Sequence, residues 1–579
     1  MIHVNKLRWC VLLAAYAVGT ACVGAVDGQA PSLLQFMKER QARRYDHVPR
    51  EVLAFYYTWY GRPERQGHWV HWGGERPESH DIPESIHYPA QGAYDSHDPA
   101  IIDRHIDLAK SHGLTGFIAT WWGPGGYDDR AFATLLARAG QKGFKVTVYW
   151  ETAPGEGAAQ IDRAVADLLY VLQWYGSADA FLKVDGNPVV FVYGRVMDQV
   201  PLKSWPAIIQ RTRQQYGRDF ALIADGYTEA YARLFDGVHT YNICGWVQGK
   251  SPDELRQPSA ASFASAVRLA KSHGGISCVT VIPGYDDTFI KLTGEYAQRF
   301  RATAASQIPI PDESTGLAPK QAELLRELYR GKTIGVLPDY SGQAVFWLAE
   351  VGIPLEELSW PQLLDPQVLD PKQLPMIVYA GGEHYVRTVH KDGDVEAALQ
   401  RYLSGGGMLI ACDWQPSPFH YDQTGQPNVA SRRLGLPING SGPVRQSDKQ
   451  KPAFVRSWET PPKDVELTFY VDSQRLPGLP ATVAFPTIGD QRWRPATEAM
   501  AAPGDVYWPL ARLRDAHGNC YGDGIVYIEH RVSPPVGGRN LYVWMRMPDL
   551  LGTNETFFSL FRFATTSSTS NRTPGNPAD

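Results

Sequence analysis

The first half of the sequence alternates short apolar segments with longer amphipathic ones, and this pattern constrains the fold more than any other feature. Short runs rich in β-branched and aromatic residues favour strands, whereas apolar residues three or four positions apart favour helices. Such alternation is typical of a parallel sheet covered by helices, an α/β fold. The predicted strands cover residues 52–57, 115–121, 145–150, 188–193, 220–224, 237–241 and 276–282.

Seven strand–helix units in about 250 residues predict a (β/α)8 TIM barrel. A doubly wound open sheet is the alternative, but no Gly-rich phosphate-binding turn follows the first strand. One strand is missing from the count, because residues 283–288 lead directly into a predicted helix at 289–302. The other predicted helices cover residues 100–112, 128–142, 160–175, 202–216 and 260–273.

Residues 333–337 could close the barrel, but we prefer to place them in a second α/β domain. Predicted strands at 332–339, 376–379 and 408–412 alternate there with predicted helices at 343–351 and 395–403. This order resembles the flavodoxin-like α/β fold of class I glutamine amidotransferases. Those enzymes use a Cys nucleophile on a turn after a strand. The corresponding turn here carries Gly381, Gly382 and Glu383 and no Cys, and we favour a solvated loop over a catalytic Glu383–His384 pair.

The expected domain order follows from these patterns. Residues 451–563 are rich in Val, Tyr, Phe, Pro and Gly and are predicted to add strands to the second domain. We assign a signal peptide to residues 1–25, the barrel to 50–305, a linker and helix to 306–330, the second domain to 331–565 and a disordered tail to 566–579.

The N-terminus predicts export from the cytoplasm. Lys6 and Arg8 precede an apolar stretch, and small residues at 23–25 fit a cleavage site, so we expect a secreted or periplasmic protein. A surface lipoprotein anchored at Cys22 is less favoured. No later segment is apolar for long enough to predict a membrane span. Cys244 and Cys278 could form a disulfide in an oxidising compartment, but we favour free thiols.

Composition excludes several kinds of partner. A net charge of −5 gives no indication of a nucleic-acid or anionic-membrane surface. The seven histidines between residues 68 and 112 are irregularly spaced, and the cysteine spacing matches no zinc motif, so we expect neither a metal nor a cofactor.

Aromatic and acidic residues follow the predicted barrel strands. In TIM barrels the functional groups lie just past the carboxyl ends of the strands. Aromatic rings stack on sugar faces, and their polar edges hydrogen-bond hydroxyl groups. This lining therefore predicts a carbohydrate site. It comprises Tyr57, Trp59, Tyr60, Trp121, Trp122, Glu151, Tyr193, Arg195, Asp225, Tyr241, Tyr285, Asp286 and Asp287.

Several stretches resemble glycoside hydrolase family 99, the endo-α-mannosidases. They are residues 56–72, 93–106, 116–129, 145–151, 170–194, 235–241 and 281–288, including YYTWYG, TWWGPGGYDD and PGYDDT. The resemblance implies a retaining hydrolase that cuts internal α-mannosidic linkages of α-mannan or another mannose-containing glycan. One carboxylate takes a proton from the sugar's 2-hydroxyl to give a 1,2-anhydro intermediate, and a carboxylic acid protonates the leaving oxygen. The resemblance assigns sugar contacts to Tyr57, Trp59, His71, Trp121, Glu151, Tyr193 and Tyr241.

The sequence departs from the family where the chemistry should be. The family's two catalytic glutamates lie in an Asn-Glu-Trp-His-Glu-Gly segment after the eighth strand, and this sequence has no such segment. We therefore expect impaired catalysis. Glu151 and Asp287 are the first candidates for a rebuilt pair, with Asp225 and Asp286 behind them. The alternatives are a pseudo-enzyme that binds mannan without cutting it, or an open barrel of low stability.

Overall fold

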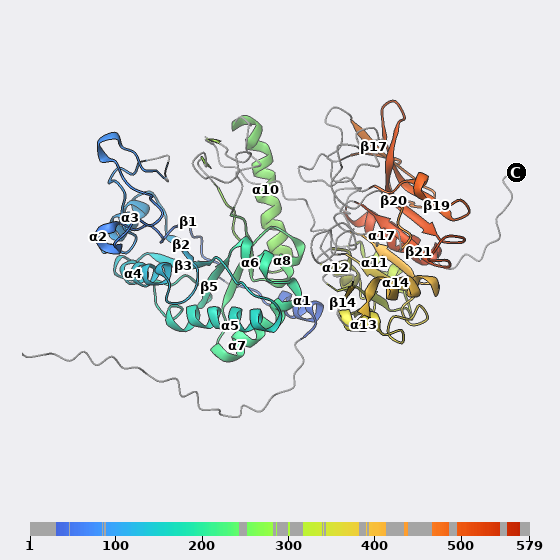
Figure 1. Ribbon diagram of the computed structural model, residues 1–579, viewed down its shortest axis with the longest axis horizontal. Coiled ribbons are helices and arrows are strands. Elements are labelled where there is room, and N and C mark those ends of the chain that lie inside the picture. Colours follow the sequence, from blue (N-terminus) through green and yellow to red (C-terminus); the bar gives the residue numbers. More distant parts are fainter. Residues whose placement is uncertain are drawn as a thin grey trace, which may run out of the picture.

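The chain forms two α/β bodies, one from each half of the sequence (Figure 1). The computed structural model describes residues 31–45, 47–83, 85, 88–241, 252–281, 285–286, 299–300, 317–338, 340, 343–380, 389–390, 393–412, 434–437, 466–485, 495–544 and 553–567. The predicted signal peptide, Cys244, Asp287 and the Glu383–His384 turn lie outside these residues. None of the described helices is both long enough and apolar enough to cross a bilayer.

The first body is a curled, TIM-barrel-like sheet of parallel strands in chain order, β1-β2-β3-β5-β6-β7-β8. This confirms the predicted barrel class. Short β4 (Lys183–Val184) pairs antiparallel with β5. The row consists of β1 (Leu53–Tyr56), β2 (Gly116–Trp121), β3 (Lys145–Trp150), β5 (Asn187–Val192), β6 (Ala221–Asp225), β7 (Gly237–His239) and β8 (Ile276–Ser277).

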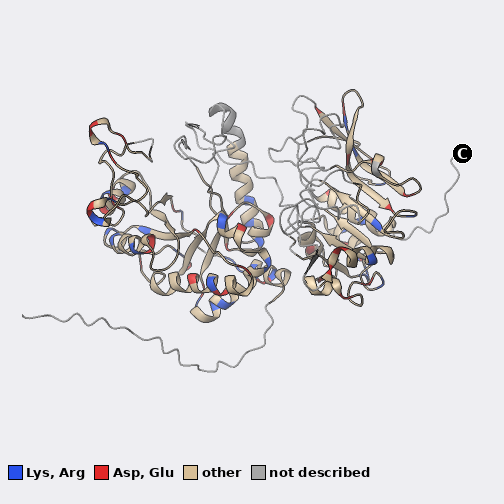
Figure 2. Cartoon of the chain, viewed as in Figure 1, with Lys and Arg blue, Asp and Glu red and all other residues tan. Residues whose placement is uncertain are grey.

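Helices cover the outside of this sheet and carry most of the charge in this half (Figure 2). All residues of β2, and all but the first of β3 and β5, are buried, as expected of parallel strands covered on both faces. The main helices are α3 (Pro99–Ser111), α4 (Tyr127–Lys142), α5 (Gly157–Trp174), α7 (Trp205–Tyr216) and α10 (Pro252–Ser272), with shorter α6 (Gly194–Gln199) and α8 (Glu229–Leu234).

Local signals set the helix ends. The Asp98 side chain accepts the N–H of Ala100 at 2.9 Å, and Pro99 begins α3 where no donor is needed. Gly143 ends α4 with a φ of 58°, in the left-handed region that glycine adopts at least cost. These residues explain why the predicted ends of α3 and α4 are accurate to one residue.

The row of barrel strands is open between β8 and β1 in the described part of the chain. β9 (Tyr285–Asp286) and β10 (Arg299–Phe300) instead form a separate antiparallel pair. The predicted helix at 289–302 is therefore wrong at residues 299–300, whose backbone groups pair with β9 rather than with a helical turn. The rest of that prediction lies outside the described residues.

The second body contains a mixed sheet of nine strands, ordered β12-β11-β13-β16-β21-β20-β19-β17-β18. Its first five strands are parallel and the others antiparallel. They are β11 (Ile334–Val336), β12 (Leu355–Glu357), β13 (Met376–Tyr379), β16 (Met408–Ala411), β17 (Leu467–Val471), β18 (Thr482–Ala484), β19 (Val506–Asp515), β20 (Cys520–Glu529) and β21 (Arg539–Val543).

Placing β11 in this sheet confirms the preferred alternative and excludes the closing of the barrel by residues 333–337. The late strands join the same sheet, as predicted. Helix α17 extends to Ser567, so the prediction of disorder is wrong for residues 566–567. The helices here are α11 (Pro319–Leu328), α12 (Gln343–Val351), α13 (Trp360–Leu364), α14 (Val395–Ser404) and α17 (Thr553–Ser567), and β14 (Val389–His390) pairs with β15 (Gly393–Asp394).

One arginine links the two bodies. Arg233, on α8 of the barrel, lies 2.7 Å from the carboxylate of Glu350 on α12 and 2.6 Å from that of Glu229 on its own helix. Its guanidinium carbon is 5.5 Å from the ring centre of Phe346. The buried guanidinium thus joins helix α8 of the barrel to helix α12 of the second body.

A helix that the sequence analysis missed, α1 (Leu33–Gln41), packs against the barrel near β6 and β7. Arg40 is buried, and its Nε donates to the carbonyl of Phe235 at 2.5 Å and lies 3.8 Å from Asp236. The Tyr45 hydroxyl donates to the same Asp236 carboxylate, which also accepts the N–H of Leu222 at 3.0 Å. Asp236 therefore connects the N-terminal segment to the strands.

Candidate active site

Three tyrosines meet at the carboxyl ends of β1, β5 and β7. The hydroxyls of Tyr57 and Tyr241 are hydrogen-bonded to each other. The Tyr193 ring lies edge-on to Tyr241, with centroids 5.5 Å apart. Strands that are far apart in sequence thus bring three predicted sugar-contacting residues together.

Asp225, at the end of β6, holds these strand ends in place. One of its oxygens accepts the N–H of Tyr241 at 3.0 Å. The other accepts the N–H of Gly194 at 3.0 Å and the hydroxyl of Tyr149 at 3.1 Å. These three bonds fix the positions of Tyr149, Gly194 and Tyr241 relative to one another.

A row of stacked rings extends from β1 into the following loop. Tyr57 stacks on Trp59 with centroids 4.8 Å apart, and Trp59 stacks on His71 at 5.1 Å. Asp95 supports this loop by accepting bonds from the Arg62 N–H, the Gln66 amide and the His97 N–H. The row presents flat apolar faces with polar edges, which suits sugar rings.

Glu151 follows β3 directly and is buried, close enough to Tyr57 and Tyr193 to add to the rise in pKa that burial causes in both hydroxyls. Burial raises its pKa to about 7, and nearby Asp128 and Asp225 act in the same direction, while the Arg195 guanidinium opposes them. At neutral pH this carboxyl is therefore present in both protonation states. Such a group can give or take a proton during a reaction.

Asp128 is a carboxylate that the candidate list missed. It lies in the first turn of α4, and the hydroxyl of Thr58 donates to it at 3.3 Å. Burial raises its pKa as well. The signal in the sequence is its place after the glycine-rich loop that follows β2, at the same end of the barrel as Glu151.

Two adjacent tryptophans at the end of β2 have different surroundings. Trp121 is fully buried, and its indole N–H donates to Asp129 at 2.8 Å, where the hydroxyls of Tyr170 and Tyr175 also donate. Trp122 is 37% exposed and lies under Arg195, whose guanidinium carbon is 4.7 Å from its ring centre. The structure therefore separates Trp121 from the other candidate contacts and brings Trp122 close to them.

The comparison with protein families agrees with this arrangement. Residues 48–305 match the model of glycosyl hydrolase family 99. This region belongs to glycoside hydrolase family 99.

The chain is similar to several mannosidase-like proteins. It is 26% identical over 293 residues to a glycoprotein endo-alpha-1,2-mannosidase-like protein of Homo sapiens, and the match covers 44% of this chain and 61% of that protein. It is 25% identical over 278 residues to the glycoprotein endo-alpha-1,2-mannosidase of Rattus norvegicus, covering 42% and 57%. The chain thus spans about three fifths of the length of these relatives.

Among solved structures, the GH99 endo-alpha-mannosidase from Bacteroides thetaiotaomicron is 25% identical, with a TM-score of 0.36, and the match covers 44% of this chain and 78% of that one. The match to the family model ends at residue 305, so the family assignment applies to the barrel and not to the second sheet.

For the remaining acidic candidates the structure gives only the backbone of Asp286. Asp286 lies in β9, whose backbone pairs with β10. Asp287 lies outside the described residues, so a Glu151–Asp287 pair stays a prediction. Cys278 forms no disulfide within the described part of the chain, and Cys244, with which it could pair, lies outside that part.

Proposed function

We propose that this protein binds mannose-containing glycans at the carboxyl end of the barrel strands of its family 99 domain, and that its hydrolysis of internal α-mannosidic linkages is impaired. The observation that carries the binding proposal is the stacked row of Tyr57, Trp59 and His71 beside Glu151. Tyr193, Tyr241 and the exposed Trp122 extend the same aromatic surface.

We infer impaired hydrolysis from the carboxyl groups that the site contains. The family's chemistry uses two carboxyl groups, and general acid–base help is worth roughly 10²–10⁴ in rate. Glu151 has a pKa suited to one of these roles. Asp225 is occupied by three hydrogen bonds, and the segment that supplies the family's glutamates does not occur in the sequence. Asp128, the other buried carboxyl near Glu151, accepts the Thr58 hydroxyl in the first turn of α4, so we propose that Glu151 lacks the second catalytic group that the family uses.

Calorimetry and a hydrolysis assay with α-mannan oligosaccharides test this proposal. We expect binding without measurable release of reducing ends. Trp59→Ala should remove binding, whereas Trp174→Ala, which truncates a 71% exposed tryptophan at the end of α5, should retain it.

Three results would count against the proposal. Turnover that disappears in Glu151→Gln would indicate a working enzyme. Absence of binding by the wild-type protein would remove the glycan-binding function. Absence of a cooperative thermal transition would favour the open, unstable barrel.

We also propose that the protein acts outside the cytoplasm. The charged residues Lys6 and Arg8 before an apolar stretch support this, together with the small residues at 23–25. N-terminal sequencing of the protein from its native host should give a chain that begins near residue 26. A mature N-terminus at Met1 would overturn the proposal.

A further inference from the structure

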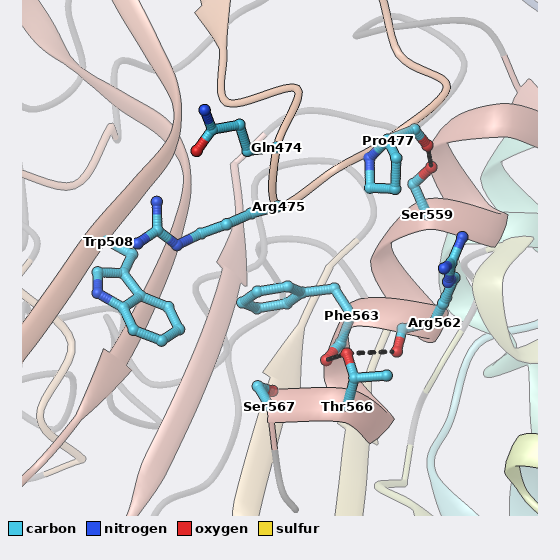
Figure 3. Close-up of a pocket in the computed structure, with 9 residues that line it drawn as sticks. All are labelled: Gln474, Arg475, Pro477, Trp508, Ser559, Arg562, Phe563, Thr566 and Ser567. Carbon is cyan, nitrogen blue, oxygen red and sulfur yellow. Dashed lines mark hydrogen bonds between the residues drawn. The ribbon is translucent and has the colours of Figure 1, made fainter. Parts of the chain in front are cut away.

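A pocket of about 310 Å³ lies in the second body, between the loop after β17, strand β19 and the last turns of α17 (Figure 3). Its two arginines, Arg475 and Arg562, extend to opposite sides of the pocket. Arg475 is already paired with Asp472 and lies 4.5 Å from the ring centre of Trp508. These side chains do not converge on one point. A more closely organised polar group surrounds Asp129 in the barrel.

Asp129, in the first turn of α4, is buried, and each of its carboxylate oxygens accepts two hydrogen bonds. One oxygen accepts the indole N–H of Trp121 at 2.8 Å and the hydroxyl of Tyr175 at 2.7 Å. The other accepts the N–H of Gly125 at 2.8 Å and the hydroxyl of Tyr170 at 2.7 Å. This carboxylate therefore joins the end of β2, the loop after it and the end of α5.

Gly125 belongs to the loop of residues 122–126 that connects β2 to α4, and its backbone is held from two sides. Its N–H donates to Asp129, and its carbonyl accepts the Arg130 guanidinium at 2.8 Å. Its φ of 72° lies in the left-handed region that glycine adopts at least cost. A Cβ at this position would meet nothing within 4 Å. Side-chain packing therefore does not fix the loop at Gly125, and the two hydrogen bonds do.

The same loop begins with Trp122, which faces the proposed sugar site. The Arg195 guanidinium lies 4.7 Å from the ring centre of Trp122 and 5.9 Å from that of Tyr193. Trp122 follows β2 and Arg195 follows β5, and β3 lies between these two strands in the barrel row. The Trp122–Arg195 pair therefore spans the end of β3, where Glu151 begins. Burial raises the pKa of Glu151 and the Arg195 guanidinium opposes this rise, which agrees with their closeness.

We propose that Asp129 is a positioning residue of the sugar site. By holding Gly125 it fixes the loop of residues 122–126, and so keeps Trp122 packed against Arg195 at the end of β3. Asp129 itself is buried behind the loop and does not contact the glycan. The effect on glycan affinity rests on the proposed function of the barrel, whereas the effect on the position of Trp122 does not.

Asp129→Asn separates this role from a purely structural one. An amide offers one oxygen and one NH2 group, so its NH2 group must face either the Trp121 indole N–H or the Gly125 N–H, and neither can accept a hydrogen bond. Trp121 is fully buried, whereas Gly125 lies in an exposed loop where water can replace its acceptor. We therefore expect the amide oxygen to stay with Trp121 and the loop to be released at Gly125.

Fluorine NMR of the full chain labelled with fluorotryptophan measures the position of Trp122 without any glycan. Trp122→Phe identifies its signal among those of the 17 tryptophans. In Asp129→Asn we expect this signal to move toward that of a solvent-exposed tryptophan. Tyr170→Phe is the matched control, because it removes the other donor to the same oxygen and leaves the Gly125 bond in place. It should leave the Trp122 signal unchanged.

Calorimetry with α-mannan oligosaccharides measures the consequence for binding. Asp129→Asn should weaken binding by about three- to tenfold, because binding must then order a side chain that the wild-type protein already holds in place. Tyr170→Phe should bind as the wild type does. Arg130→Gln releases the carbonyl of the same glycine from an exposed side chain, so it should give a smaller loss in the same direction. It also provides the test if Asp129→Asn does not fold.

An unchanged Trp122 signal in both Asp129→Asn and Arg130→Gln would overturn the proposal. Equal changes in Asp129→Asn and Tyr170→Phe would also overturn it, because they would indicate general loosening around Asp129 rather than loss of the Gly125 bond. A shifted Trp122 signal with unchanged mannan affinity would refute the role of this loop in binding. If the wild-type protein binds no mannan but the Trp122 signal shifts as expected, the proposed glycan-binding function fails and the positioning of Trp122 by Asp129 is supported.

Discussion

The hydroxyl of Tyr57 is hydrogen-bonded to the hydroxyl of Tyr241, 184 residues further along the chain. The two residues follow β1 and β7, the first and sixth strands of the barrel row, so the bond joins these strands at their carboxyl ends. It orients the ring of Tyr57, which begins the stacked row with Trp59 and His71. The shape of the proposed sugar surface thus depends on a contact between distant parts of the sequence.

Removal of this hydrogen bond should weaken glycan binding more than it weakens the fold. Tyr57→Phe keeps the ring but loses one hydroxyl, at a cost of about 0.5–1.5 kcal/mol. We expect a several-fold loss of affinity for α-mannan oligosaccharides by calorimetry and a small fall in Tm. Tyr521→Phe, which removes a hydroxyl bonded to Asp515 in the second body, is the control. Equal losses of affinity in both variants would contradict the role of the Tyr57–Tyr241 pair.

Glu151 should make stability depend on pH in a specific direction. Burial raises its pKa to about 7, so the folded state holds this proton more tightly than the unfolded chain does. The free energy of unfolding should therefore fall as pH rises from about 4.5 to about 7, by roughly 1–3 kcal/mol from this group. Glu151→Gln imitates the protonated form, so it should remove this part of the pH dependence of the unfolding free energy.

Urea unfolding of both proteins at several pH values measures the difference. The variant should gain stability relative to the wild type as pH rises through this window and keep a constant difference above it. A constant difference across the whole range would show that Glu151 titrates at an ordinary pKa.

The two acidic partners of Arg233 should contribute unequally to stability. Glu229 is buried, whereas the side chain of Glu350 is 44% exposed. Arg233→Ala removes the guanidinium 2.6 Å from the buried Glu229, which also lies 2.9 Å from His273, and should cost about 3–5 kcal/mol. Glu350→Gln removes a half-exposed pair and should cost less than about 1 kcal/mol. Equilibrium unfolding of the two variants measures these losses. Similar losses would indicate that the Arg233–Glu350 pair between the bodies contributes most of the stability that Arg233 provides.

The N-terminal helix should depend on Asp236. Asp236→Ala removes the acceptor shared by Tyr45 and Leu222 and the buried counter-charge of Arg40. We expect a loss of about 3–5 kcal/mol in equilibrium unfolding, because a buried charge is left unpaired. Asp219→Ala is the control: that side chain is 53% exposed and pairs with Arg43 and Arg213, so its loss should cost less than about 1 kcal/mol. A small effect at Asp236 would show that α1 is held by its apolar contacts alone.

Local patterns were sufficient to predict the bounds of several elements. The predicted bounds of β3, α12 and β13 agree with the structure, because continuous apolar runs and helical spacing are properties of adjacent residues. The order of strand and helix likewise predicted the barrel class. Helix α1 was missed, since the partner of its buried Arg40 lies 195 residues away.

Adjacent Trp121 and Trp122 show what such local patterns cannot predict: which of two neighbouring side chains faces the site. Alternation along extended backbone makes Trp121, the last residue of β2, and the following Trp122 point in opposite directions. Which of them faces the sugar-binding end depends on the helices packed behind the strand. There Asp129 of α4 accepts the indole N–H of Trp121 and the hydroxyls of Tyr170 and Tyr175.

Local sequence patterns thus predicted the strand order, the family of the barrel and the chemical kinds of side chain at its carboxyl end. They did not predict which rings stack, that Asp225 positions its neighbours, or that burial raises the pKa of Glu151. Secondary structure follows from near neighbours in the chain. Stacking, desolvation and shared hydrogen bonds instead depend on residues that are distant in sequence and meet only in the folded chain.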